Sequence, residues 1–181
     1  MKRDDAVNRL RAARKELQDT LVGLTEEDLL RPNAIKKWSI KDLLAHIAAW
    51  DEELLRVIQA FAMQDEPQYS YSISDRNDFA EWNVQQVEQH RPLSLHQVLI
   101  ELENARRDLI QSVEGATDQV LLRRKVTSWG AEHTGLDLLE QAADHDLEHA
   151  SHIRSYRKKR ERWARARAKY VSKRREAKSG E

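Results

Sequence analysis

The sequence predicts an all-α fold, a four-helix bundle that continues into a long basic helix at its C-terminal end. Glycine and proline are scarce, with 5 and 3 residues among 181, so long helices are favoured. Apolar side chains recur at spacings of three and four along four separate segments, as on helices with one buried face. Four such segments, joined by short and medium connections, pack naturally as a bundle.

The first helix is expected from about Asp5 to about Val22. Leu10 and Leu17 belong to its buried stripe, and Gly23 stands where such a helix would end. Residues 25–32 then indicate a short helical turn followed by a stop.

The second helix is expected to begin at Ser39, which can cap it, with Asp42 returning the hydrogen bond from the third helical position. Trp38, just before the cap, can pack against Leu43. The apolar stripe continues for six turns through Leu43, Ile47, Trp50, Leu54, Ile58 and Phe61. Residues 64–74 contain a proline and small polar residues, which predict a loop.

The third helical region is expected in two pieces, because Pro92 interrupts it. The first piece covers residues 79–87. The second opens with a capping box formed by Ser94 and Gln97 and continues to Gly115, the next plausible break.

The last helix is expected from Thr134, after a linker at residues 126–130, with Asp137 at its third position. No helix breaker precedes Gly180, so this helix should run for some 40 residues, or about 60 Å. No strand pattern is evident in the sequence.

Several classes of protein are excluded by composition. The chain has no cysteine, so it contains neither disulfides nor thiolate metal sites. Its first five residues are mostly charged and precede no apolar run, unlike a signal peptide. No segment approaches the roughly 18 apolar residues that a membrane span needs. We therefore expect a cytoplasmic protein without membrane contact.

The net charge of zero conceals an uneven distribution. Residues 154–181 hold 13 Lys and Arg against 3 Asp and Glu, so this tail carries +10 and the rest of the chain −10. Tyr156, Trp163 and Tyr170 recur in it at intervals of seven. The tail can pack its aromatic stripe on a second subunit, bind nucleic acid through its charge, or remain a solvated helix end.

The histidines are the main candidates for chemistry. His145 and His149 lie one turn apart on the last helix, so both imidazoles point the same way and can chelate one divalent metal. His152 shares their face, and His46 lies on the inward face of the second helix. Three histidine ligands with open coordination positions are typical of a catalytic site. Histidines that are satisfied within a core would give the same pattern, so both interpretations stay open.

Three carboxylates stand close to these histidines. Glu148 can flank the pocket as a base or face solvent, and Asp144 neighbours the ligands in sequence. Asp42 can support the imidazole of His46 or act only as a helix cap. The remaining histidines are expected at the surface: His90, His96 and His133.

Three segments carry a resemblance to a known family. Residues 38–50, WSIKDLLAHIAAW, and residues 145–153, HDLEHASHI, resemble the second-helix and last-helix signatures of the DinB-like four-helix-bundle superfamily. Residues 78–83, DFAEWN, and 93–95, LSL, are similar to its ClbS/DfsB branch. The resemblance extends to about residue 156. Residues 1–156 are accordingly expected to form the bundle, and residues 157–181 a basic helical extension.

The resemblance implies an up-down-down-up bundle that holds a divalent metal, usually zinc or nickel, on three histidines. By position these are His46, His145 and His149. His152 stands where members of the family often carry glutamine. The resemblance therefore does not decide whether His152 is a fourth ligand. Members with known activities use the site for thiol-linked transferase or isomerase chemistry. The ClbS/DfsB branch implies self-protection against a reactive small molecule, and some of its members lack the three histidines.

Three hypotheses follow. The chain is a metal-dependent enzyme acting on a small electrophile or thiol conjugate, a binding protein for self-protection that needs a pocket but no turnover, or an interaction module whose basic tail docks on a polyanion. The expected partners are a small-molecule ligand or substrate and a second copy of the chain, with nucleic acid as the alternative for the tail.

Overall fold

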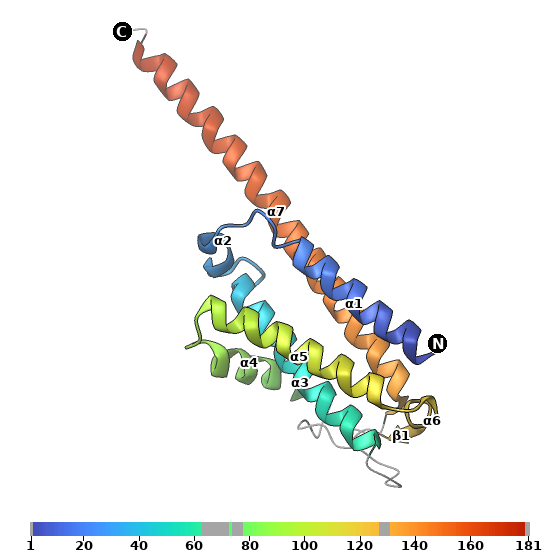
Figure 1. Cartoon of the computed structure of the whole chain (residues 1–181). Helices are drawn as coiled ribbons and strands as arrows, with labels where there is room; N and C mark the ends of the chain where they lie inside the picture. The colour runs from blue at the N-terminus through green and yellow to red at the C-terminus, as the bar shows by residue number, and fades with distance from the viewer. Residues whose placement is uncertain (1, 63–72, 74–77, 127–130, 180–181) are drawn as a thin grey trace.

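The computed structural model of the chain describes residues 2–62, 73, 78–126 and 131–179, with the side chains of 173–179 excepted. The elements in chain order are α1 (Arg3–Asp19), α2 (Glu26–Leu30), α3 (Ile40–Ala62), α4 (Phe79–His90), α5 (Leu95–Gly115), α6 (Asp118–Leu121), β1 (Arg124–Val126), β2 (Glu132–Thr134) and α7 (Gly135–Ser179). Helices α1, α3, α5 and α7 form a four-helix bundle (Figure 1).

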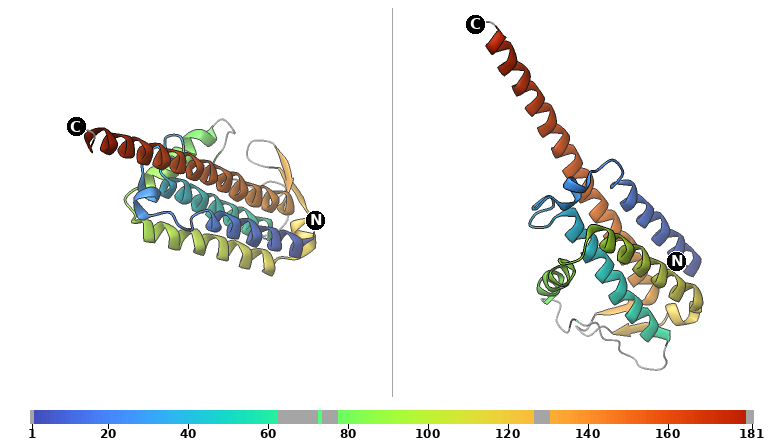
Figure 2. Two further views of the ribbon diagram at one scale, coloured as in Figure 1. Left: turned by 90° about the horizontal axis from the view of Figure 1, so that it is seen from above. Right: turned by 60° about the vertical axis from the view of Figure 1, so that its left-hand side comes forward.

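The order of directions in the bundle is up-down-down-up, as predicted. Helices α1 and α7 lie side by side and run one way, whereas α3 and α5 lie side by side and run the other way (Figures 1 and 2). Two successive helices that run in the same direction need a long return connection, and α4 forms part of it. Helix α3 also contacts α7, which brings the two histidine-bearing helices together.

The predicted helix starts are confirmed by their caps. The backbone N–H of Ser39 donates to Asp42 Oδ2 at 2.9 Å, and the N–H of Asp42 donates to Ser39 Oγ at 3.0 Å. Ser94 and Gln97 make the same reciprocal pair at the start of α5, with distances of 2.8 and 3.2 Å. Each pair satisfies two backbone donors that the helix leaves unpaired, and so fixes where the helix begins.

Helix α1 is shorter at its C-terminal end than predicted, because it stops at Asp19 rather than near Val22. The hydroxyl of Thr20 donates to the carbonyl of Leu17, which satisfies a terminal acceptor of the helix. Gly23 adopts a φ of 80°, a conformation that favours glycine and turns the chain away. Leu21 and Leu24 continue the spacing of Leu10 and Leu17 in the sequence, but they pack against the core from the loop after the helix.

A short β-hairpin corrects the expectation that the chain contains no strand. Strands β1 and β2 pair antiparallel, with Lys125 opposite His133. Strands of three residues are too short to show an alternating pattern. Lys125 is buried, with its ammonium 5.2 Å from the centre of the Phe61 ring, so a charged residue occupies the inward position. Most of the predicted linker (126–130) and loop (64–74) lies outside the described residues.

Helix α7 is the longest element, and it confirms a helix that continues past Trp163. Its 45 residues correspond to about 68 Å, and it extends beyond the other bundle helices (Figure 2). At its start, the backbone N–H of Thr134 donates to Asp137 Oδ2 at 2.8 Å, and the N–H of Asp137 donates to Thr134 Oγ1 at 3.1 Å. Trp163 is 52% and Tyr170 66% exposed, whereas Tyr156 is buried against the bundle.

The first basic residues of the extension dock on the chain's own bundle. Arg157 donates to the carbonyls of Thr20 and Val22 at 2.7 and 2.6 Å. Arg160 forms an ion pair of 2.7 Å with the buried Asp28 of α2. The exposed part of α7 therefore begins beyond Arg160. Within the described part of the chain, no helix is sufficiently long and apolar to span a membrane.

Candidate metal centre

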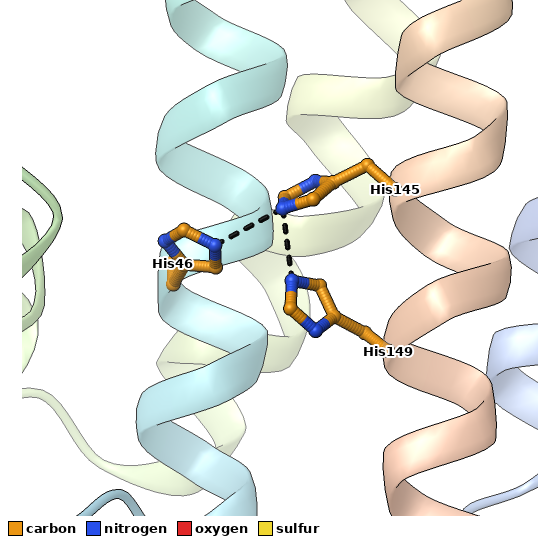
Figure 3. Close-up of side chains that lie close together, drawn as sticks. All are labelled: His46, His145 and His149. Carbon is orange, nitrogen blue, oxygen red and sulfur yellow. Dashed lines mark hydrogen bonds between the residues drawn. The ribbon is translucent and has the colours of Figure 1, made fainter. Parts of the chain in front are cut away.

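The three predicted histidines converge between α3 and α7. His46 projects from α3, and His145 and His149 project from successive turns of α7 (Figure 3). His145 Nε2 lies 3.0 Å from His46 Nε2 and 2.8 Å from His149 Nε2. One nitrogen from each ring lies within 4.8 Å of those of both others. Among the described residues, no other group of histidine and carboxylate side chains shows such a convergence.

Burial keeps these imidazoles neutral near pH 7. It lowers the pKa of His46 from 6.5 to about 4 and is the main cause that lowers the pKa of His149 to about 3. The pKa of His145 also lies well below 6.5, because of burial and of the neighbouring histidines and arginines. A neutral imidazole keeps the free lone pair that binds a metal.

Acidification should therefore destabilise the metal-free protein. The unfolded chain binds protons below about pH 6.5, whereas buried His46 and His149 do so only near pH 4 and pH 3, so stability falls across that interval. Between pH 7 and pH 5, each should contribute a loss of about 2 kcal/mol to the free energy of unfolding. Urea denaturation at both pH values in the presence of a chelator measures it. A His149→Gln variant should lose less, and an equal loss would contradict this assignment.

His152 lies behind His149 rather than at the point of convergence. Its Nδ1 is 3.3 Å from His149 Nδ1, the ring nitrogen that faces away from His145. The imidazole of His152 can therefore orient His149, but it does not belong to the group of three rings whose nitrogens converge. The ring centre of Trp38 lies 5.1 Å from that of His46. His46 Nδ1 is buried, and the described residues offer it no hydrogen-bond partner.

The three carboxylates considered from sequence are placed differently. Asp42 accepts the helix-capping hydrogen bond from Ser39. Asp144 pairs with Arg9 of α1 at 2.6 Å. Glu148 is exposed at the cavity rim, with Oε1 3.9 Å from His152 Nε2.

A cavity of about 630 Å³ opens onto the three histidines. Its walls are largely apolar and aromatic. Trp50 of α3 donates from its indole nitrogen to Asn83 Oδ1 at 2.8 Å and contacts Phe79 edge to face at 5.7 Å. The lining residues that face this space include Trp38, Leu54, Leu138, Gln141 and Ala142. A volume of this size accommodates a small organic molecule beside the histidines.

A buried ionic network lies next to the histidines in the bundle core, and the sequence analysis did not predict it. Arg14 of α1 donates to Asp51 of α3 at 2.7 Å and to Asp146 of α7 at 2.9 Å. Arg106 of α5 binds Asp51 through two hydrogen bonds of 2.9 Å and lies 3.2 Å from Asp146. Burial acts to lower the pKa of Arg14, but the two carboxylates outweigh it and raise that pKa. The network joins all four bundle helices.

The sequence did contain a signal for this network. Asp146 stands three residues after Ala143 and four before Ala150, both of which are fully buried, so it occupies a position of the apolar stripe. Arg14 likewise stands between the buried Ala13 and Leu17 of the first helix. Charged residues at such positions are buried only when they are paired, which predicts partners of opposite charge.

Comparison with known proteins identifies the family to which the chain is similar. Residues 9–153 match the DinB superfamily. The fold is similar to that of the colibactin self-resistance protein ClbS, solved with double-stranded DNA, with a TM-score of 0.73 and 12% identity over 87% of this chain and 96% of that one. YfiT from Bacillus subtilis, described as a probable metal-dependent hydrolase, gives a TM-score of 0.66 and 15% identity over 87% of this chain and 86% of its own.

A third solved structure, a mycothiol-dependent maleylpyruvate isomerase, gives a TM-score of 0.70 and 12% identity over 84% of this chain and 61% of that chain. No curated protein sequence matches significantly. At these identities the solved structures establish a shared fold, whereas the family match extends over most of the chain. The chain belongs to the DinB superfamily.

Proposed function

We propose that this protein is a metal-dependent enzyme that acts on a small electrophile or thiol conjugate. The observation that carries the proposal is the convergence of His46, His145 and His149 through their Nε2 atoms at the edge of a cavity. Two structural relatives support it, since one is described as a probable metal-dependent hydrolase and the other as a thiol-dependent isomerase.

The three histidines fit a divalent metal, zinc or nickel. They offer three neutral imidazole nitrogens from two helices, and a set of three protein ligands would leave a catalytic metal able to bind a further molecule. A metal bound there supplies Lewis-acid chemistry, which lowers the pKa of a thiol or a water molecule. His152 holds His149 in orientation through the outer ring nitrogen. Glu148, at the rim, is the carboxylate placed to accept a proton from a molecule in the cavity.

Elemental analysis of protein purified without an affinity tag tests this proposal. We expect about one zinc or nickel ion per chain, because three preoriented imidazoles bind such ions tightly. Dialysis against a chelator followed by addition of each metal should restore the same ratio. A ratio near zero after reconstitution would contradict a metal-dependent activity.

A second candidate is a self-protection protein that captures a reactive small molecule without turnover. The similarity to ClbS and the apolar cavity favour it. The two candidates differ in stoichiometry, because a capturing protein consumes one equivalent of the reactive molecule, whereas an enzyme consumes many. Dependence of the reaction on added metal would favour the enzyme.

We further propose that the exposed part of the basic extension, beyond Arg160, packs on a second copy of the chain. The exposed rings of Trp163 and Tyr170 face water on a helix whose like charges repel each other. The rest of the chain carries the opposite charge, so an acidic surface of a second copy would relieve both costs.

Truncation after Glu161 should convert a dimer into a monomer. It preserves the ion pair between Arg160 and Asp28, so the bundle should stay folded and keep its metal. Light scattering of both chains at equal concentration measures the mass. Equal monomeric masses would contradict the dimer. DNA binding that falls steeply with salt and disappears on truncation would instead favour a polyanion as the partner.

A further inference from the structure

Two lysines stand at the mouth of the cavity on a tight turn. Ile35 and Trp38 exchange two backbone hydrogen bonds of 2.9 and 3.0 Å, so Lys36 and Lys37 form the two residues between them. Both lysines line the cavity, together with the flanking Ile35 and Trp38. The turn connects directly to the cap of α3, and therefore to the helix that carries His46.

The backbone at Lys36 is strained. Its φ is 54°, a region that favours glycine, so a lysine in this position lowers the stability of the fold. Asn33 in the same loop has a φ of 56°, but asparagine tolerates this conformation more readily. Backbone strain of this kind is concentrated at ligand-binding and active sites.

The charges around the cavity leave these ammonium groups uncompensated. Three carboxylates also line the cavity. Arginines neutralise Asp51 and Asp144, and Glu148 at the rim lies 3.9 Å from His152 rather than in an ion pair with either lysine. Within the described ranges, neither Lys36 nor Lys37 has an ion-pair partner.

The cavity between the lysines and the histidines is suited to an apolar body. Trp38, Trp50 and Phe79 line it, and Asn83 contributes an amide whose oxygen is already occupied by the Trp50 indole. A ligand that is complementary to both the lysines and the apolar walls has an anionic group at the turn and an apolar or aromatic part within the cavity.

We propose that the turn formed by Lys36 and Lys37 is the anion-binding subsite of this cavity. It binds the carboxylate or phosphate group of a small, partly apolar substrate, whose other end then faces His46, His145 and His149. The orientation of the substrate, with its other end toward the histidines, rests on the function proposed above. Binding of the anionic group depends on the lysines alone.

A matched pair of probes tests this subsite. 1-Naphthaleneacetate and 1-naphthaleneacetamide have nearly the same shape, but only the first carries a negative charge. Quenching of tryptophan fluorescence gives both affinities. We expect the acid to bind roughly tenfold more tightly than the amide at low salt. 1-Naphthyl phosphate, compared with the acid, distinguishes a preference for phosphate from one for carboxylate.

The double variant Lys36→Gln/Lys37→Gln should bring the ratio of the two affinities close to one and leave the affinity for the amide unchanged. An unchanged ratio would overturn the proposal. All titrations are run on protein as purified and after chelation, with metal content measured on each sample. A preference for the acid that disappears with the metal and ignores the lysines would assign the anion to the metal. A lysine-dependent preference in protein that binds no metal would support the subsite and contradict the proposed enzyme.

Lys36→Gly separates the strain from the charge. It should raise the melting temperature by about 2–4 °C, because glycine relieves the positive φ, while it weakens binding of 1-naphthaleneacetate. Lys37→Gly is the matched control, since Lys37 has no positive φ and should gain no stability. A Lys36→Gly variant that is more stable and still prefers the acid as strongly as the parent would contradict a role for this ammonium.

Discussion

Replacing Asp146 with asparagine is expected to lower the free energy of unfolding by about 3–5 kcal/mol. Asp146 is 0% exposed and lies within 3.2 Å of both Arg14 and Arg106. The variant would leave two buried guanidinium groups facing the single carboxylate of Asp51. A buried charge without compensation costs far more than an intact pair contributes, so most of the loss comes from the arginine that remains.

Asp144→Asn is the matched control for this experiment. Asp144 lies two residues earlier on the same helix and also pairs with an arginine of α1, but both partners are exposed. Its loss should be close to the error of urea denaturation, because water screens and replaces such a pair. Similar losses in both variants would show that Asp146 is no more than one ion pair among many.

The network also bears on the histidines, because Asp146 directly follows His145 and Asp51 lies on the helix of His46. Arg14 and Arg106 bind both carboxylates and so hold α3 at a fixed distance from α7. A shift of one helix along the other would separate these charges from their partners within the core, which is costly. The network therefore favours the register in which the three imidazoles meet.

Much of this fold could be predicted from local sequence signals. A capping box is complete within four residues, so the start of α3 at Ser39 and that of α5 at Ser94 could be located closely. The stripe of the second helix also identified the inward face on which His46 lies. These features depend on neighbours in sequence, whose geometry in a helix is known in advance.

The features that were missed depend on contacts between distant residues or on single dihedral angles. The partner of Arg14 lies 132 residues away in Asp146. The apolar periodicity marks each of these residues as buried, but it does not say which arginine pairs with which carboxylate. The inward position of the β-hairpin is occupied by a buried lysine, Lys125, which a pattern of apolar residues cannot reveal. The positive φ of Lys36 arises from closure of a two-residue turn, and glycine or asparagine would have been the expected signal.

Replacing His149 with alanine is expected to abolish stoichiometric metal binding, whereas His152→Ala should only weaken it. His149 offers Nε2 to the point where the three rings meet, 2.8 Å from His145 Nε2. His152 contacts only the outer nitrogen of His149. Loss of an orienting partner costs roughly 10–100-fold in affinity, and loss of one of three ligands should exceed that range.

The two variants have similar helix propensity and remove the same side chain, so a difference between them reports on the position of the ring. Competition with a chromophoric chelator measures affinity, and circular dichroism checks that the bundle remains folded. Metal should raise the melting temperature of the parent and of His152→Ala, in proportion to the logarithm of its concentration over Kd, but not that of His149→Ala.

If instead His152→Ala loses the metal and His149→Ala retains it, the ligand set is wrong, and the second ring of α7 at the site is His152. That exchange would require a rotation of α7 by about 60°, a sixth of a turn, or a rearrangement of its side chains. The buried ion pairs of Asp146 on the same helix oppose such a rotation.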